Sequence, residues 1–348
     1  MTGRGIDPAS FAARLVRWQR DQGRHDLPWQ QGRDPYRVWV SEIMLQQTRV
    51  DTVLRYYPRF LQRFPDVRAL AAAALDEVLE QWSGLGYYRR ARNLHACARQ
   101  VCLLHGGHFP RTRQELEALA GIGRSTAAAI AVFCFEQREA ILDANVQRVL
   151  GRAFGLRPGS DAASRKAMWD CAESLLPRQD LPAYTQGLMD LGATVCKPTR
   201  PDCLLCPFAA DCPRELDPVR AARAPAPAAR RSLPWVLLWA RDPARPAIWL
   251  QRRDAHGIWP GLWCLPQHDD ESRALAQARA LGGVLHCVRH DPVLHRLTHV
   301  DLLLHPMEVV LRPHALAADA GDGAGWFDPA RALRLGLPAP VRKLLQRA

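Results

Sequence analysis

Residues 115–133 read ELEALAGIGRSTAAAIAVF, and this stretch decides the fold of the first half of the chain. Apolar residues at helical spacing lie on both sides of a tight turn at Gly121, Ile122 and Gly123, which predicts a helix, a turn and a second helix. The two glycines let the backbone approach a neighbour closely, and the second helix begins with unpaired N–H groups. A DNA phosphate fits such a hairpin, although a G-x-G between two helices is more often a plain turn.

Helical patterns surround this hairpin from Phe11 to about Leu216. The next stretch, DPVRAARAPAPAARRSLP, has no apolar stripe and alternates Ala, Pro and Arg, which is typical of an extended basic linker. Beyond it lie short strand patterns, such as PWVLLWA and VDLLLHPMEVVL, and helical patterns at ESRALAQARALGG and near the C-terminus. The sequence therefore predicts a mainly α-helical domain over residues 1–216, a linker over 217–233 and a smaller α+β domain over 234–348.

The composition narrows the class of protein. The chain has 348 residues, of which 48% are hydrophobic and 24% charged, as expected for a globular protein of two ordinary domains. Lys and Arg outnumber Asp and Glu by 47 to 35, and the net charge of +12 favours a polyanionic partner, DNA or RNA. The apolar stretches are too short to cross a membrane, and the N-terminus lacks the apolar core of a signal peptide. We therefore expect a cytoplasmic protein that does not bind membranes.

Four of the ten cysteines lie in one loop, CKPTRPDCLLCPFAADC. They are separated by six, two and five residues, and recurring prolines stiffen the loop. Four thiolates in so short a segment can bind one metal centre. Zinc sites usually use two close cysteine pairs, of which this loop has one, so a [4Fe-4S] cluster is favoured over structural zinc. The expected ligands, in the loop at residues 196–212, are Cys196, Cys203, Cys206 and Cys212, and the other six cysteines are expected in the core.

One aspartate, Asp143, separates an apolar run from a predicted helix in AILDANVQRVLG. An Asp before Val146, Val149 and Leu150, whose spacing is helical, is a common N-cap. The residues alone leave open whether Asp143 is a cap, a catalytic group or both.

Together these motifs resemble the helix-hairpin-helix DNA glycosylases with an iron–sulfur loop, and within them the A/G-specific adenine DNA glycosylases of the MutY type. The resemblance rests on stretches that span residues 27 to 212, namely LPWQQGRDPYRVWVSEIMLQQTRV, GLGYYRRARNLH, LAGIGRSTAAAI, ILDANVQRV and MDLGATVC. It implies an enzyme that removes adenine opposite 8-oxoguanine or guanine from double-stranded DNA, with a Nudix-like domain after the glycosylase domain. We expect a monomer, because one lesion needs one active site.

The resemblance implies two catalytic carboxylates. Glu42, among the apolar residues of VWVSEIML, is the expected general acid and later the general base, since apolar neighbours raise a carboxyl pKa. Asp143 is expected to remain ionised at its cap position and to stabilise the cationic sugar, supported by Asn145. The family's Asp-Gly-Asn is Asp-Ala-Asn here, which suits a helical backbone at Ala144 but not a left-handed turn.

Ser125 decides whether the enzyme also cuts the strand. In related bifunctional enzymes a lysine at this place in the hairpin attacks the sugar, and a serine cannot form the resulting imine. The sequence therefore predicts base removal without an efficient lyase step. An endonuclease III-like enzyme acting on oxidised pyrimidines is the alternative, and a DNA-binding iron–sulfur module without catalysis is a third hypothesis, disfavoured because both carboxylates are present.

Further positions match residues that contact DNA in the family. Gln47 and Tyr87 match the two that wedge into the base stack when adenine is extruded, although an aromatic near a glycine-rich turn is more often plain packing. The remaining matches are Trp29, Leu45 and Gln186 near the adenine pocket, and Gly121, Gly123 and Ser125 in the DNA-binding hairpin.

The C-terminal domain resembles the Nudix-like domain of the same family. Its helix ESRALAQARALGG carries a single Glu, whereas a Nudix hydrolase binds magnesium through several, so hydrolysis of oxidised nucleotides is disfavoured. The resemblance implies that 8-oxoguanine is recognised by a loop that reads Leu297, Thr298 and His299 here. Thr and His keep the polar groups of the family's Phe-Ser-His, while Leu loses the aromatic ring. Without the resemblance, THVDLLLH would be interpreted as a strand with a polar start.

Overall fold

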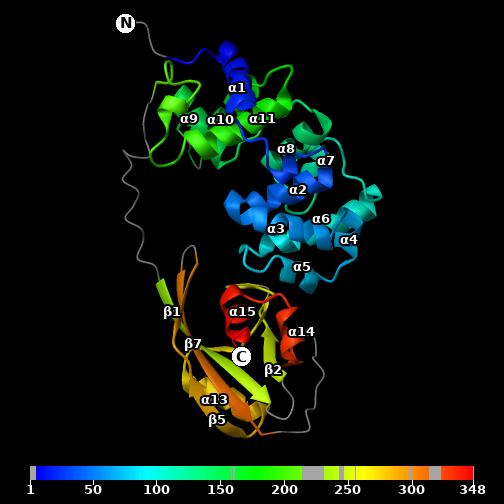
Figure 1. Ribbon diagram of the computed structural model, residues 1–348, viewed down its shortest axis with the longest axis vertical. Helices are drawn as coiled ribbons and strands as arrows, with labels where there is room; N and C mark the ends of the chain where they lie inside the picture. The colour runs from blue at the N-terminus through cyan, green and yellow to red at the C-terminus, as the bar shows by residue number, and fades with distance from the viewer. Residues whose placement is uncertain are drawn as a thin grey trace. The chain divides into compact units, whose positions relative to one another are not determined.

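The computed structural model describes residues 5–157, 159, 161–213, 231–242, 247–254, 256–297, 300–312 and 323–347. The chain forms two compact units, which we describe separately (Figure 1). The first comprises Met1–Ala71 and Ala96–Ala226, and the second comprises Ala72–His95 and Pro227–Ala348. Residues 214–230, which hold most of the expected linker, lie outside the described residues. Within the described ranges, no helix has both the length and the apolar character needed to span a membrane.

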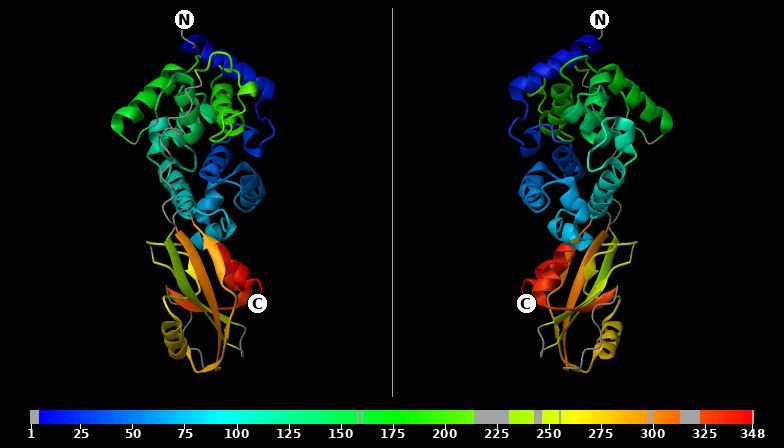
Figure 2. Two further views of the ribbon diagram at one scale, coloured as in Figure 1. Left: turned by 90° about the vertical axis from the view of Figure 1, so that its left-hand side faces the viewer. Right: turned by 90° about the vertical axis from the view of Figure 1, so that its right-hand side faces the viewer.

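The first unit is built of helices, as predicted (Figure 2). They are α1 (Pro8–Gln22), α2 (Pro35–Leu45), α3 (Val50–Arg63), α4 (Val67–Ala72), α7 (Arg113–Glu117), α8 (Arg124–Phe135), α9 (Ala144–Phe154), α10 (Ala162–Ser174), α11 (Leu181–Asp190) and the second part of α6 (Arg89–His105). Aspartates cap several of them: Asp7, Asp34, Asp143 and Asp161 each accept a hydrogen bond from a backbone N–H in the first turn. These local signals explain why the helices begin where they do.

The helix-turn-helix hairpin predicted at residues 115–133 is present. Helix α7 ends at Glu117 and α8 begins at Arg124 after the turn at Gly121, whose φ of 75° favours glycine. The next glycine, Gly123, caps α8 without a side-chain hydrogen bond, and a Cβ placed there would meet nothing within 4 Å. The position of the Gly123 Cβ at the start of α8 is therefore open.

The stretch VWVSEIMLQQTRVDTVLRYYPRFLQRF, residues 38–64, has apolar residues at helical spacing but folds as two helices. Helix α2 ends at Leu45 and α3 begins at Val50, and between them Gln47 adopts a left-handed φ of 55°. Polar residues fill this gap, so the apolar periodicity on its two sides does not reveal the break. The interruption leaves Gln47 exposed between the two helices.

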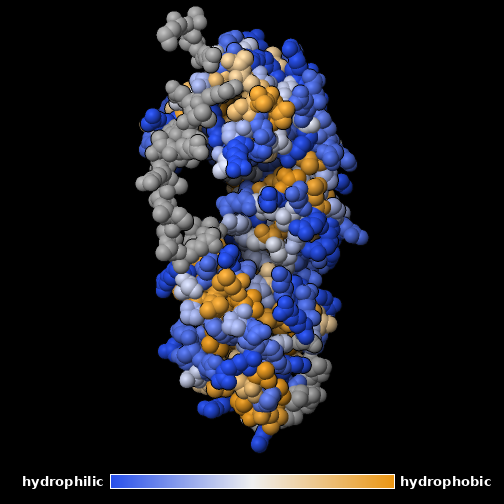
Figure 3. Space-filling model, turned by 60° about the vertical axis from the view of Figure 1, so that its left-hand side comes forward, coloured by the Kyte–Doolittle hydropathy of each residue, from blue (hydrophilic) through white to orange (hydrophobic). Residues whose placement is uncertain are grey.

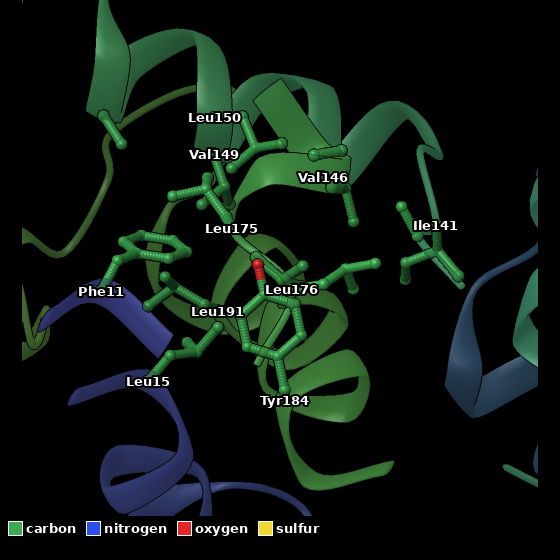
Figure 4. Packing of buried hydrophobic residues seen from close by; sticks show 14 of the residues in the cluster. Phe11, Leu15, Ile141, Val146, Val149, Leu150, Leu175, Leu176, Tyr184 and Leu191 are labelled. Atoms are coloured by element: carbon green, nitrogen blue, oxygen red, sulfur yellow. The ribbon is translucent and has the colours of Figure 1, made fainter. Parts of the chain in front are cut away.

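The core of the first unit joins both ends of the domain (Figure 4). Phe11 of α1 stacks on Phe208 of the cysteine loop with a centroid distance of 4.5 Å, and meets Phe154 of α9 edge-on at 5.2 Å. Tyr184 of α11 lies 6.4 Å from the Phe11 ring. Aromatic pairs of this kind add to the stabilisation from burial alone. The cysteine loop is therefore packed against the same core that supports α9 and α11.

The second unit contains a mixed sheet. Its strands are β1 (Arg231–Asp242), β2 (Ala247–Arg252), β3 (Trp263–Cys264), β4 (Gln267–His268), β5 (Val284–Arg289), β6 (Val293–Arg296), β7 (Val300–Leu311) and β8 (Ala324–Phe327). The order is β3-β2-β1-β7-β5, with β4 on β1, β6 on β7 and β8 on β2. The two long central strands, β1 and β7, run parallel from Arg231↔Val300 to Arg241↔Val310. Both strands contain nearly continuous apolar runs, which is the pattern from which the sequence predicted them.

Helices complete this unit: α5 (Leu75–Gln81), the start of α6, α13 (Glu271–Leu281), α14 (Pro329–Leu333) and α15 (Ala339–Leu345). Ala274 and Ala278 of α13 are buried against Val236 and Leu238 of β1 and Val309 of β7. The fold class predicted from the sequence, a helical domain followed by a smaller α+β domain, is confirmed. Figure 3 shows a surface on which hydrophilic residues predominate and hydrophobic ones gather in separate patches.

Candidate active site

A cavity of about 690 Å³ opens in the first unit. Six residues predicted from the sequence line it, namely Trp29, Glu42, Leu45, Asp143, Asn145 and Gln186. They come from α2, α9 and α11 and from the short 3-10 turn η1 (Pro28–Gln30). Residues far apart in the sequence thus meet around one space that is large enough for a nucleobase.

Glu42 lies on α2 between the buried Ser41 and Ile43 and is only partly exposed. Burial, followed by the negative charge of Asp143, raises the pKa of this carboxyl from about 4.5 to about 8. This shift favours the protonated form of Glu42 at neutral pH. The expectation of an elevated pKa is confirmed, with desolvation as its main cause.

Asp143 is the N-cap of α9. Its side chain accepts a hydrogen bond of 2.8 Å from the N–H of Val146. Burial raises the pKa of Asp143, which opposes the ionisation expected from its cap position. The backbone N–H groups of Val146 and Asn145 and the charge of Arg148 act in the opposite direction but do not cancel the desolvation. The cavity therefore holds two carboxyl groups that both resist ionisation.

Arg148 connects the cavity to the cysteine loop. Its guanidinium donates to Oδ1 of Asn145 at 2.6 Å, to the carbonyl of Gly192 at 2.7 Å and to the carbonyl of Cys196 at 2.7 Å. Helix α11 continues at this point into a π-helical turn, η2 (Leu191–Val195). A Cβ on Gly192 would lie 2.6 Å from Cβ of Asn145. The glycine in MDLGATVC thus permits a close approach that positions Asn145.

The hairpin also reaches this site. Oγ of Ser125 accepts a hydrogen bond of 3.0 Å from the N–H of Leu142, the residue before Asp143. Ser125 therefore fastens α8 to the segment that presents Asp143. The Ser125 hydroxyl oxygen thus has a structural role as an acceptor.

The two expected wedge residues share an unusual backbone. Gln47 in the first unit has a φ of 55°, and Tyr87 in the second has a φ of 50°. Left-handed conformations are uncommon for residues other than Gly, Asn and Asp and often mark functional positions. Tyr87 is 45% exposed, and the guanidinium of Arg90 lies 5.4 Å from its ring centroid. Neither residue lines the cavity.

Sequence reasoning missed a buried ion pair at the cavity wall. Asp190, at the end of α11, is fully buried and binds Arg24, a cavity residue that follows α1. A charge within the apolar run at Met189–Leu191 was the available signal for Asp190. Nothing in the pattern around Arg24 sets it apart from the other arginines.

The four cysteines of the loop line a second, small cavity together with Arg152. Burial, with a contribution from the negative charges of the other three cysteines, raises the pKa of Cys206 to about 11. Four thiolates gathered in this way need a cationic centre to offset their repulsion. In the described part of the chain, no group of three or more Cys, His, Asp or Glu side chains is gathered closely enough to hold a metal ion.

The remaining cysteines are less uniform than expected. Cys97 and Cys264 are buried, as predicted, whereas Cys102, Cys134, Cys171 and Cys287 are only half-buried. They lie on helices or strands that expose one side, so an apolar neighbourhood in the sequence does not ensure full burial.

In the second unit, Leu297 is half-buried and its N–H donates to the carbonyl of Val300 at 2.9 Å. Thr298 and His299 lie outside the described residues. Helix α13 begins at Glu271, whose carboxylate forms an ion pair of 2.6 Å with Arg289. The one glutamate of this helix is therefore engaged with a cation of the protein itself.

Comparison with known proteins places both halves of the chain. Residues 40–174 match the HhH-GPD superfamily of base excision DNA repair proteins, and residues 235–347 match the NUDIX domain. An adenine DNA glycosylase of Buchnera aphidicola subsp. Baizongia pistaciae is 32% identical over 340 residues, covering 96% of this chain and 95% of that protein. The adenine DNA glycosylase of Rattus norvegicus is 45% identical over 217 residues, covering 59% of this chain and 42% of that protein.

Solved structures agree with this placement. A thermostable thymine-DNA glycosylase is 30% identical with a TM-score of 0.55, covering 59% of this chain and 94% of that one. Endonuclease III in a complex with DNA is 21% identical with a TM-score of 0.51, and it shares the helical fold. Since the similarity to the Buchnera protein runs through the helical unit and the C-terminal unit alike, the chain belongs to the adenine DNA glycosylase family of base excision repair enzymes.

Proposed function

We propose that this enzyme hydrolyses the N-glycosidic bond of adenine mispaired with 8-oxoguanine or guanine in double-stranded DNA. The observation that carries the proposal is the raised pKa of Glu42 in the cavity that Asp143 also lines. Breaking an N-glycosidic bond requires a proton for the leaving base and a negative group beside the cationic sugar. Two carboxyl groups with different environments can supply both.

In the first step, the proton of the Glu42 carboxyl moves to N7 of the extruded adenine. The C1′–N9 bond then breaks, and its electron pair leaves with the base. A neutral base is a better leaving group than its anion, so the raised pKa of Glu42 serves the reaction directly. The sugar that remains is an oxocarbenium ion.

Asp143 acts on this cation. Its desolvated carboxylate gains stability when a positive charge develops beside it, because the cavity offers little competing water. The interaction is electrostatic, or covalent in a transient bond to C1′. Glu42, now ionised, removes a proton from a water molecule that attacks C1′ from the face the base left, which gives retention of configuration.

Ser125 supports a monofunctional reaction. Its hydroxyl is engaged with the Leu142 N–H, and a serine has no amine with which to form an imine. We therefore expect an abasic site as the product, with the strand intact.

Cys196, Cys203, Cys206 and Cys212 would hold a [4Fe-4S] cluster, which would neutralise the thiolates and fix the loop. Arg148 connects that loop to α9, and the aromatic stack of Phe11 on Phe208 connects it to α1. We further propose that Leu297, Thr298 and His299 recognise 8-oxoguanine. Gln47 and Tyr87 would wedge into the base stack, and Gly121 and Gly123 would bind a DNA phosphate. The proposed enzyme is monomeric and cytoplasmic.

The test uses end-labelled duplexes that contain adenine opposite 8-oxoguanine, guanine or cytosine, or an oxidised pyrimidine opposite guanine. Each reaction is divided, and half is heated in alkali. The proposal predicts breaks at adenine opposite 8-oxoguanine and guanine that appear only after alkali. Cleavage at the oxidised pyrimidine without alkali would instead support an endonuclease III-like activity.

A further inference from the structure

Asp190 is fully buried but does not line the cavity, and it lies directly behind two residues that do. Its Oδ2 accepts from the backbone N–H of Arg24 at 2.9 Å, and its Oδ1 accepts from Nε of the same arginine at 2.8 Å. Nε2 of Gln186, one helical turn earlier on α11, donates to Oδ1 at 2.9 Å. One carboxylate thus holds both side chains.

These contacts fix the direction of the Gln186 amide. A carboxylate paired with a guanidinium only accepts hydrogen bonds, so the NH₂ end of the amide must face Asp190. The carbonyl oxygen, Oε1, then lies on the other side. Gln186 and Arg24 both line the cavity, and Asp190 binds Nε and Nη2 of Arg24. We infer that the wall presents an acceptor from Gln186 next to a donor from Nη1 of Arg24, which is not bonded to Asp190.

This order of acceptor and donor matches one type of purine edge. Adenine carries an amine donor at C6 beside the ring acceptor N1, whereas hypoxanthine and guanine carry a carbonyl acceptor at C6 beside an N1–H donor. A buried polar group that meets a like group leaves both unpaired, and sites of this kind reject the wrong partner strongly. The direction of the Gln186 amide therefore decides which purine fits.

We propose that Asp190 is a positioning residue that sets the preference of the cavity for 6-aminopurines over 6-oxopurines by holding Gln186 and Arg24 in these orientations. The inference rests on the proposed function, in which the excised base enters the cavity of Glu42. Asp190 itself does not contact the substrate in this proposal. The competing interpretation is that Asp190 only fastens the segment after α1 to α11.

The experiment compares full-length wild-type enzyme with the Asp190→Asn variant in single-turnover excision. The duplexes carry adenine, unsubstituted purine or hypoxanthine opposite 8-oxoguanine. An asparagine can donate as well as accept, so the Gln186 amide becomes free to turn. We expect the adenine-to-purine rate ratio to fall about tenfold, the loss of one hydrogen bond, and the hypoxanthine-to-adenine ratio to rise. Equal losses on all three bases would overturn the proposal, because a merely structural role lowers every rate alike.

Two variants sharpen the result. Asp180→Asn removes the exposed ion pair with Arg20, 2.6 Å long, at the other end of α11, and should leave all ratios unchanged. In a Gln186→Leu background, Asp190→Asn should no longer change the adenine-to-purine ratio, because the amide through which it acts is absent. A persistent change there would contradict the proposal. If the wild-type enzyme released no adenine from any duplex, the proposed function itself would fail, which is a different outcome.

Discussion

The two units place their glutamates in opposite environments. In the first, Glu42 is half-buried and desolvated beside a second carboxyl group, and its pKa rises to about 8. In the second, Glu271 of α13 lies near the surface, and its ion pair with Arg289 lowers its pKa. The same side chain thus favours its protonated form in one unit and its ionised form in the other. Position in a helix does not distinguish them, because the surroundings decide the chemistry.

The largest expected effect comes from Asp143. Asp143→Asn keeps the cap, since Asn also accepts from the N–H of Val146, but removes the negative charge beside the sugar. We expect single-turnover excision of adenine to fall by roughly a thousandfold or more. DNA affinity, measured by electrophoretic mobility shift on the same duplex, should change little. An equal loss of binding and excision would mean that Asp143 is a structural cap only.

Glu42→Gln should have the next largest effect on activity, about a hundredfold or more, since the amide cannot supply the proton. It should also stabilise the protein. Between pH 4.5 and 8 the folded wild type binds more protons than the unfolded chain, so its stability falls as pH rises through this window. The variant avoids this cost, and we expect it to exceed the wild type by roughly 1–3 kcal/mol at pH 9 in chemical denaturation. Equal stability at pH 9 would contradict the buried location of Glu42.

A smaller effect is expected at Gly192. Gly192→Ala forces a Cβ to within 2.6 Å of Asn145, so either α9 or the π-helical turn must shift. We expect a loss of about 1–3 kcal/mol in stability and about a tenfold slower excision. Gly5→Ala is the matched control, because a Cβ there meets nothing within 4 Å. Normal excision by Gly192→Ala would show that Asn145 need not occupy its present position.

The smallest effect should follow Glu271→Gln in the second unit. Its exposed ion pair contributes little, and α13 carries no reactive carboxylate in the proposed chemistry. Excision of adenine opposite 8-oxoguanine should remain within about twofold of the wild type, with or without added magnesium. Loss of activity on this variant would show that the helix has a role that its surroundings do not indicate.

Local sequence patterns predicted what depends on local interactions. The cap at Asp143, the glycine turn at Gly121 and the long apolar strands β1 and β7 each follow from neighbouring residues. The break at Gln47 cannot be located from the sequence, because the apolar residues have helical spacing on both sides of it. The short strands β3 and β4 were also missed, since two residues carry too little pattern.

The site itself required more than local patterns. The resemblance to a family brought Glu42, Asp143 and Gln186 together before the structure placed them around one cavity. Asp190 and Arg24 were not found, because their pairing joins positions 166 residues apart. The desolvation that raises the pKa of Asp143 likewise depends on residues distant in the sequence, which the cap position alone does not reveal.

The pH dependence of single-turnover adenine excision, on an enzyme saturated with a duplex carrying adenine opposite 8-oxoguanine, tests the central claim most directly. If a protonated Glu42 supplies the proton, the rate should fall about tenfold for each pH unit above about 8, and the residual rate of Glu42→Gln should lack this decline. A wild-type rate that stays constant from pH 7 to 10, or a decline that persists in Glu42→Gln, would contradict the account.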